Sequence, residues 1–109
     1  MGANIITTKE LVTYLDPDSL DATVWGVNIE WRGDDKYAVT HLSSCLNDVG
    51  EWVHEPIPSS RTDEFIAATR FDYDIARRWA IAVADTVVVN GMNWRDVADK
   101  KMSAEGDTE

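Results

Sequence analysis

The apolar segment "IARRWAIAVADTVVV" restricts the fold of this chain more than any other feature of the sequence. After Arg78 nearly every residue is Trp, Ile, Val or Ala, so a helix formed there has almost no polar face. A helix that is apolar all round must be covered on all sides. The segment therefore predicts a buried central helix over 73–89. We expect Asp72 to be its N-cap and Asn90-Gly91 to form its C-cap.

The first twenty residues carry a complete signal for a short helix. Thr7 and Glu10 have the spacing of a capping box, in which each side chain accepts from the backbone N–H of the other residue. Pro17 disfavours helical geometry at the residue before it. We therefore predict a short amphipathic helix over 8–15, which ends at this proline.

A second helix is predicted over 35–53, because the apolar residues of this segment recur at helical spacing. These residues are Ala38, Leu42, Cys45, Leu46, Val49, Trp52 and Val53. Two prolines then interrupt the pattern. We therefore predict a loop over 55–61.

Two shorter helices are predicted from residues that typically cap a helix start. Thr62 is expected to cap a helix over 63–69. Asn93 is expected to cap a helix over 94–102. The polar segment 103–109 that follows is expected to be a frayed acidic tail.

Residues 18–31 fit two structures. Their apolar residues are spaced as on one helix face, whereas from Trp25 to Trp31 they alternate strictly with glycine and polar residues, as in a strand. We prefer the helix. The alternative is a β-hairpin within 24–42 that turns through "RGDDK" at 32–36.

Together these elements predict one domain over 1–109, which is an ordinary length for a single domain. The expected fold class is mainly α. The expected architecture is a small helical bundle around a buried central helix at about 73–89, with the alternative β-hairpin within 24–42.

The charge balance argues against ordinary binding to duplex DNA. The chain has 20 acidic and 10 basic residues, a net charge of −10, whereas most of the affinity for DNA comes from Lys and Arg that neutralise phosphates. The excess is concentrated in residues 1–64, which contain 12 acidic and 4 basic residues. Proteins are therefore the expected partners.

Cys45 is the one cysteine of the sequence. It excludes an internal disulfide and fits the reducing environment of a cytoplasm. The sequence has no basic segment followed by an apolar run, and no apolar stretch of 18 residues. We therefore expect neither a signal peptide nor a membrane-spanning helix.

Few residues suggest catalysis. His41 and Cys45 are four apart, a spacing that would place a base beside a thiol, or two zinc ligands, on one side of a helix. Two ligands do not complete a zinc site, and no CxxC or HExxH pattern supplies the others. We interpret this pair as unreactive, and His54 as a residue of a helix end or the surface. We expect no metal and no cofactor.

The charged residues around the start of the central helix also have a structural interpretation. Asp72, Asp74, Arg77 and Arg78 could form an acid–base pair with a phosphate clamp, but acids in the first turn and bases in the next are typical of a stable helix start. The sequence contains no glycine-rich phosphate loop and no nucleophile motif. We therefore predict that the protein is not an enzyme.

The five tryptophans are the most informative candidates for binding. Trp79 belongs to the predicted central helix and is expected in the core. A domain of this size does not usually bury all of the other four tryptophans completely. These are Trp25, Trp31, Trp52 and Trp94. Tryptophan is enriched at interface cores, so these four are candidate partner contacts. The alternative is that all five pack in one core.

The stretch "IITTKELVTYLDPDSLD" resembles the N-terminus of the head-to-tail connector, or head–tail adaptor, proteins of tailed phages, especially those of actinobacterial hosts. The residues that carry the resemblance are Thr7, Glu10, Leu11, Tyr14 and Leu15. The later order of "AVTHLSSCLNDVGEWV", "HEPIP" and "IARRWAIAVADTVVV" is similar to the family's order of long helix, proline loop and apolar helix.

The resemblance implies a structural virion protein, made in the bacterial cytoplasm and placed in the neck of the virion. It implies an all-helical subunit in a twelve-fold ring beneath the portal. Such a ring joins capsid to tail, contacts the portal protein and the next neck or tail protein, and lines a channel through which DNA passes without specific binding. The contacts would come from the exposed tryptophans and from 94–109, including Lys100, Lys101 and Met102.

The charge of the chain supports an alternative from another class. A small acidic protein encoded by a phage could be a DNA-mimic inhibitor, which presents carboxylates in place of phosphates to a host nucleic-acid-binding protein. A small enzyme that uses His41 and Cys45 is the third and least favoured interpretation.

Overall fold

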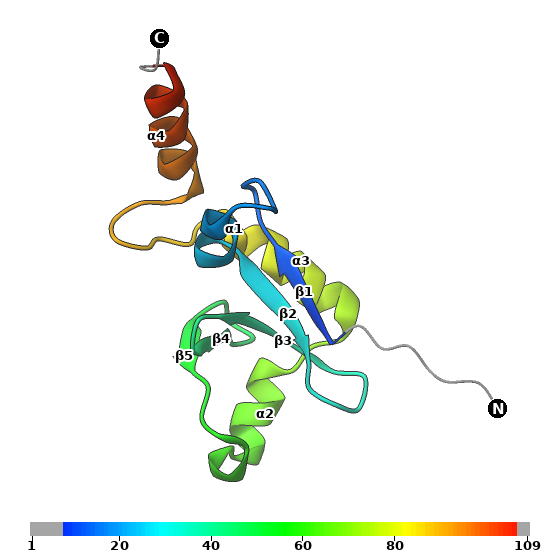
Figure 1. Cartoon of the computed structure of the whole chain (residues 1–109). Coiled ribbons are helices and arrows are strands. Elements are labelled where there is room, and N and C mark those ends of the chain that lie inside the picture. The colour runs from blue at the N-terminus through cyan, green and yellow to red at the C-terminus, as the bar shows by residue number, and fades with distance from the viewer. Residues whose placement is uncertain (1–7, 107–109) are drawn as a thin grey trace, which may run out of the picture.

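The computed structural model describes residues 8–106 and contains a five-stranded antiparallel sheet (Figure 1). The strands are β1 (Lys9–Val12), β2 (Val27–Trp31), β3 (Tyr37–His41), β4 (Ser44–Leu46) and β5 (Trp52–His54). They lie side by side in chain order, each antiparallel to the next. The helices are α1 (Leu20–Trp25), α2 (Asp63–Thr69), α3 (Tyr73–Ala84) and α4 (Trp94–Gly106), and η1 is one 3-10 turn (Pro58–Ser60).

The prediction of a mainly α, all-helical bundle is therefore wrong. The chain forms a mixed α/β domain, in which α3 packs against β1, β2 and β3. The five strands and α1 lie within residues 9–54, and the other three α-helices follow them.

The predicted helix over 8–15 is a strand and a turn instead. In β1, Leu11 and Val12 pair with Asn28 and Val27 of β2. A helix of two turns is marginal on its own because its nucleation is costly, so pairing with a neighbouring strand outweighs it. Thr7 of the predicted capping box lies outside the described residues. The turn after β1 begins at Asp16, whose carboxylate accepts from the backbone N–H of Asp18.

The predicted helix over 35–53 is also wrong, because this segment forms β3, β4 and β5. Tight turns break it every few residues. Leu42 has a φ of 56° between β3 and β4, and Gly50 a φ of 84° between β4 and β5. Leu42 and Val49, which belong to the predicted apolar helix face, are exposed in these turns. The apolar residues of these strands and turns happen to recur at helical spacing, so the sequence pattern also fitted a helix.

Both structures considered for residues 18–31 are present in part. Leu20–Trp25 is helical, capped by the Ser19 side chain, and Val27–Trp31 is a strand. The β-hairpin alternative within 24–42 is thus the structure of β2 and β3. In its turn the Arg32 N–H donates to the Lys36 carbonyl, and the Lys36 N–H donates to the Gly33 carbonyl.

The central helix is shorter and more one-sided than predicted. α3 ends at Ala84, five residues before the predicted end at 89. The β-branched residues that follow favour extended backbone, and Val89 forms a bridge with Met92 across a turn. Asn90-Gly91, the predicted C-cap, forms the turn between Val89 and Met92 and does not cap α3. Asp72 occupies the N-cap position of α3 without a capping hydrogen bond from its side chain.

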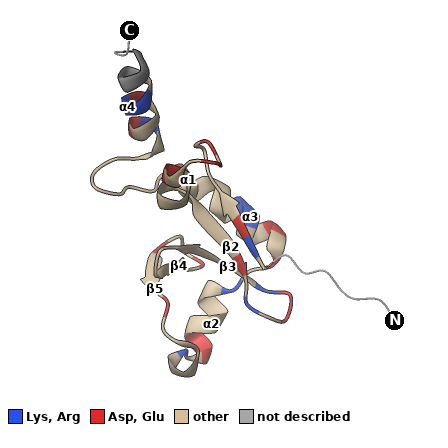
Figure 2. Ribbon diagram, viewed as in Figure 1, with Lys and Arg blue, Asp and Glu red and all other residues tan. Residues whose placement is uncertain are grey.

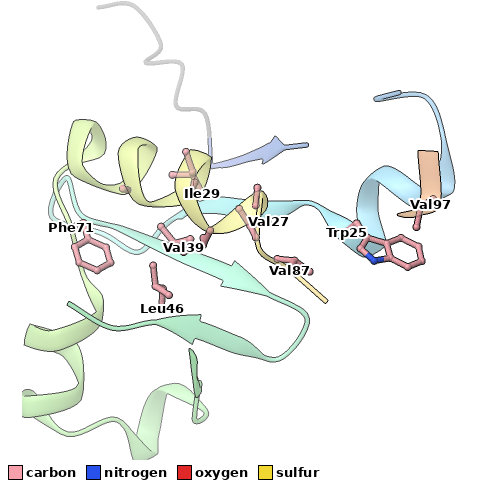
Figure 3. Packing of buried hydrophobic residues seen from close by; sticks show 12 residues of the cluster. Trp25, Val27, Ile29, Val39, Leu46, Phe71, Val87 and Val97 are labelled. Atoms are coloured by element: carbon pink, nitrogen blue, oxygen red, sulfur yellow. The ribbon is translucent and has the colours of Figure 1, made fainter. Parts of the chain in front are cut away.

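α3 covers only one face of the sheet. Its buried residues are Ala76, Ala80, Val83 and Ala84, whereas Ile75 and Ile81 are exposed. The small alanines allow the helix to lie close to the strands. Figure 3 shows Val27, Ile29, Val39, Leu46, Phe71 and Val87 gathered between α3 and the sheet, with Trp25 and Val97 packed together at one end.

The shorter elements were predicted correctly. Thr62 caps α2 through its side chain, and 55–61 is a loop that contains η1. Asn93 and Asp96 exchange hydrogen bonds at the start of α4, as in a capping box. α4 extends to Gly106, so part of the predicted tail 103–109 is helical, and 107–109 lie outside the described residues.

α4 projects away from the sheet at the opposite end of the molecule from η1 and α2 (Figure 1). It contacts the remainder of the chain through its first two turns. Val97 is buried against the core cluster, and the Lys101 ammonium lies 3.7 Å from an Asp21 carboxylate oxygen.

Within residues 8–106, no helix is long and apolar enough to span a bilayer.

Candidate functional site

His41 and Cys45 do not face each other. In the register of β3 and β4, His41 lies opposite Ser44 and Thr40 opposite Cys45, so the two side chains are on opposite faces of the sheet. The His41 Nε2 donates to the Val24 carbonyl oxygen at 2.8 Å. Cys45 is completely buried, and burial raises the pKa of its thiol. His41 is therefore not placed to act as a base for this thiol, and the thiol is shielded from solvent.

The other sequence-derived candidates for chemistry lie on the surface. His54 is exposed on β5, and Asp74, Arg77 and Arg78 are exposed on α3. Asp72 pairs with Lys36, whose ammonium lies 2.6 Å from its carboxylate. The described part of the chain contains no group of three or more His, Cys, Asp or Glu side chains that could hold a metal ion.

The four candidate tryptophans lie in different environments. Trp25 belongs to the core with 8% of its surface exposed, and its indole Nε1 donates to the Met92 carbonyl. Trp31 is half-buried on β2, opposite Tyr37. Trp52 is half-buried on β5 beside His41.

Trp94 is half-buried at the base of α4, where it fixes the helix to the domain. Its ring stacks on Tyr14 with centroids 5.1 Å apart, and its Nε1 donates to the Asp85 carboxylate at 2.8 Å. The Arg95 guanidinium also contacts this carboxylate at 2.6 Å. The hydrogen bond from Trp94 and the charge of Arg95 lower the pKa of Asp85. This tryptophan therefore anchors α4.

The predicted contact residues Lys100, Lys101 and Met102 are exposed on α4, and Met102 has 70% of its surface exposed. Two hollows flank the base of the helix. One, of about 260 Å³, lies between α1 and α4 and includes Trp25 and Lys100 in its lining. The other, of about 240 Å³, includes Tyr14 and Met102. The structure thus brings together Trp25, Trp94 and the three α4 residues, while Trp31 and Trp52 lie elsewhere.

A cluster of charged residues that was absent from the sequence-based candidates lies on the sheet face opposite α3. We call it the Glu55 cluster, and it consists of Glu55 and three arginines, Arg32, Arg61 and Arg70. Each arginine follows a different element. Arg32 directly follows β2, Arg61 follows η1 and Arg70 follows α2.

Arg32 makes the closest contact with Glu55. Its Nη2 and Nε donate to the two carboxylate oxygens at 2.7 and 3.2 Å. Arg70 Nη2 donates to Oε2 at 3.3 Å, and Arg61 Nη2 lies 3.7 Å from the same oxygen. The side chain of Glu55 is 13% exposed and that of Arg70 8%. One carboxylate is therefore shared by three guanidinium groups with little water.

Glu30 and Thr40 extend the polar layer along the sheet. A Glu30 carboxylate oxygen lies 3.8 Å from Arg32 Nη1, and the Thr40 hydroxyl donates to the same carboxylate. Thr40 is buried. The register places both on the sheet face opposite that of Ile29 and Val39.

The pKa values of the residues in the Glu55 cluster are shifted in different directions. Burial alone would raise the pKa of Glu55, but the hydrogen bond from Arg32 and the charges of all three arginines outweigh it and lower the pKa. The hydrogen bond to Glu55 raises the pKa of Arg32. Burial lowers the pKa of Arg70, and the charges of the other two arginines add to this effect. The Glu55 cluster therefore has three guanidinium charges and only one carboxylate charge, so its net charge is positive.

A pocket of about 560 Å³ opens beside the cluster. Its lining contains Arg32, Lys36, Arg61, Arg70 and Asp34 as charged residues, and Gly33, Pro58, Ile66 and Ala67 as the others. Glu55 and Glu30 are absent from the lining. Figure 2 shows basic residues at the β2–β3 turn and at the end of α2, on the two sides of this region.

In comparison with known proteins, no family model, no curated protein and no solved structure matches this chain. The resemblance to head-to-tail connectors therefore stays a prediction from the sequence.

The Glu55 cluster had no signal in the sequence. Arg32 and Glu55 are 23 residues apart, and Glu55 and Arg70 are 15 apart. Each is a single charged residue at the end of an element, without a repeated spacing or a motif. The sheet brings them together, so the cluster could not be found before the strands were placed.

Proposed function

We propose that this protein is a non-enzymatic assembly subunit, which uses α4 to bind neighbouring subunits and forms a ring as a head-to-tail connector. The observation that supports this proposal is the position of α4, a helix of 13 residues anchored at its base and projecting from the domain (Figure 1). The all-helical fold implied by the resemblance is wrong. The proposal therefore depends on the shape of the molecule and on its N-terminal sequence.

The base of α4 offers a place for a neighbour to dock. Ring contacts of this kind join two different surfaces, one from each subunit. The exposed Met102 provides an apolar side chain on α4, and the hollow beside it includes Tyr14 and Leu15. An apolar side chain from a neighbouring subunit would fill this hollow and exclude water from it.

The charge of the chain fits a ring through which DNA passes. Acidic residues occupy the turn after β1 and the β2–β3 turn (Figure 2). A wall with net negative charge repels DNA and prevents it from sticking.

The test is the mass of the purified protein, measured by light scattering with and without a portal protein. We expect a large assembly, at least in the presence of the portal. Met102→Asp should abolish the assembly, because it places a charge in the contact. Ile57→Asp is the matched control, since Ile57 is 67% exposed in the loop before η1, far from α4. A wild-type monomer that ignores the portal would contradict the proposal.

The second candidate function is a DNA-mimic inhibitor, and one observation favours it. Six carboxylates are exposed in the turns of the sheet half of the molecule: Asp16, Asp18, Asp34, Asp35, Asp48 and Glu51. Such groups could stand in for phosphates on a host protein. A monomer that binds a host nuclease or polymerase, and is displaced by DNA, would support this function over the connector.

A further inference from the structure

We propose that the pocket beside the Glu55 cluster binds a phosphate group, either free or as the monoester of a small molecule. This inference is independent of the assembly function. It is based on three features of the pocket: its excess of cations, their burial, and the arrangement of their donors.

The lining of the pocket is positive in a strongly acidic protein. Three of the ten basic residues of the chain meet at one carboxylate. Even with Glu30 counted, three guanidinium charges face two carboxylates. The lining itself contains four cations and one acid, Asp34. Lys36 shares its charge with Asp72 at the exposed rim.

Arg61 has donors that Glu55 does not use, whereas Nη1 of Arg70 already donates to the hydroxyl and carbonyl oxygens of Thr69. Arg32 takes both carboxylate oxygens, so Arg61 and Arg70 are left with longer contacts of 3.7 and 3.3 Å. Among the described residues, the side chain of Arg61 makes one hydrogen bond, from Nε to the Pro56 carbonyl. A guanidinium has five N–H donors. The remaining donors of Arg61 can therefore serve an anion in the pocket.

An oxyanion with several oxygens suits this arrangement. Guanidinium groups bind phosphate through pairs of parallel hydrogen bonds, which are stronger than bonds between neutral groups. Three guanidiniums that approach from three chain segments can contact different oxygens of a tetrahedral phosphate, whereas a planar carboxylate offers only two. Phosphate is therefore the ligand class that the cluster favours.

The remaining wall allows for an organic part. Pro58, Ile66 and Ala67 form an apolar side of the pocket. Its volume of about 560 Å³ is within the usual range for small-molecule sites, roughly 300–1,000 Å³. A phosphate monoester could place its phosphate on the arginines and its organic part against this wall.

Isothermal titration with inorganic phosphate and with AMP tests the proposal, with chloride at equal ionic strength as the reference. We expect phosphate to bind the wild-type protein and to bind Arg61→Gln about tenfold more weakly, since one charge-assisted contact is lost. Arg78→Gln, which removes an exposed arginine of α3, should bind like the wild type. Tighter binding of AMP than of phosphate would identify the ester, and equal binding the free anion.

Absence of phosphate binding to the wild-type protein, or equal binding by Arg61→Gln, would overturn the proposal. Binding of acetate in place of phosphate would overturn the assigned ligand class. A second measurement does not depend on a variant that folds. In NMR spectra of the wild-type protein, the Nε–H signals of Arg61 and Arg70 should shift with phosphate but not with chloride, and unchanged signals would contradict binding at this site.

Discussion

The two faces of the sheet are buried in opposite ways. Under α3, Ile29 and Val39 meet the alanines of the helix in a dry apolar layer. On the other face, Glu30 and Thr40 lead to the Glu55 cluster, where charges are partly removed from water. Apolar burial stabilises a fold without any requirement for direction, whereas buried charges cost desolvation energy that only well-placed partners offset.

Because of this difference, we expect the apolar face to contribute most to the stability of the domain and the charged face to bind anions. The apolar face joins α3 to three of the five strands. The charged face joins four segments through one carboxylate and leaves cations in the lining of a pocket. Substitutions on the two faces should therefore differ in size, in dependence on pH and in response to anions.

The largest effect is expected on the apolar face. Ile29 is 2% exposed, and Ile29→Ala should lower the free energy of unfolding by about 3–4 kcal/mol, through lost burial and the cavity that remains. Urea denaturation measures this loss. Ile75→Ala is the matched control, because Ile75 is 44% exposed on α3 and should lose less than about 1 kcal/mol. Similar losses in both variants would mean that α3 does not cover Ile29.

On the charged face, Glu55→Gln should cost about 2 kcal/mol at neutral pH, since it removes the carboxylate that three guanidiniums share and leaves only Glu30 beside Arg32. The loss should depend on pH. The pKa of Glu55 lies below its ordinary value of 4.5 in the folded protein. Glu55 therefore makes its full contribution to the free energy of unfolding above pH 4.5. This contribution is lost as the pH falls from 4.5 through the lowered pKa of the folded protein.

Urea midpoints of the wild type and Glu55→Gln at pH 6 and pH 3 measure this dependence. Arg32, Arg61 and Arg70 are the charged groups that face Glu55, and arginine is a side chain that does not lose its proton in proteins. The pKa of Asp85 is also lowered, but Asp85 is present in both proteins, so its effect cancels in the comparison. A difference between the two proteins that stays constant with pH would contradict the assignment.

A smaller effect is expected where the apolar layer reaches the β4–β5 turn. Gly50 has a φ of 84°, and an added Cβ would lie 3.1 Å from the Trp79 ring. Gly33 has a φ of 92° with open space around it. Gly33→Ala should cost about 1 kcal/mol from backbone strain alone, and Gly50→Ala somewhat more because the ring must move. Equal thermal shifts would mean that Trp79 does not pack on this turn.

The elements with local signals were predictable from the sequence. α2 and α4 begin at the expected caps, Thr62 and Asn93, because a cap depends only on neighbouring residues. The strands were not predictable in the same way. Their apolar residues also fit a helix over 35–53, and only pairing between strands decides between the two structures.

The candidate site shows the same limit. Trp94 and Met102 could be proposed as contact residues, because residue type and exposure on a capped helix can be anticipated. The Glu55 cluster could not, since its four residues come from four segments that the sheet and α2 bring together. An early prediction of the β2–β3 hairpin would have placed Arg32 but not its partners.

One measurement shows whether the charged face holds cations that are available to an anion. This is the shift in melting temperature that phosphate causes, relative to chloride at equal ionic strength, in the wild type and in Glu55→Gln. Because Glu55 is absent from the pocket lining, its loss leaves the pocket open and frees its three arginines. We predict a larger shift in Glu55→Gln than in the wild type. A shift that is equal, smaller or absent in Glu55→Gln would contradict the claim.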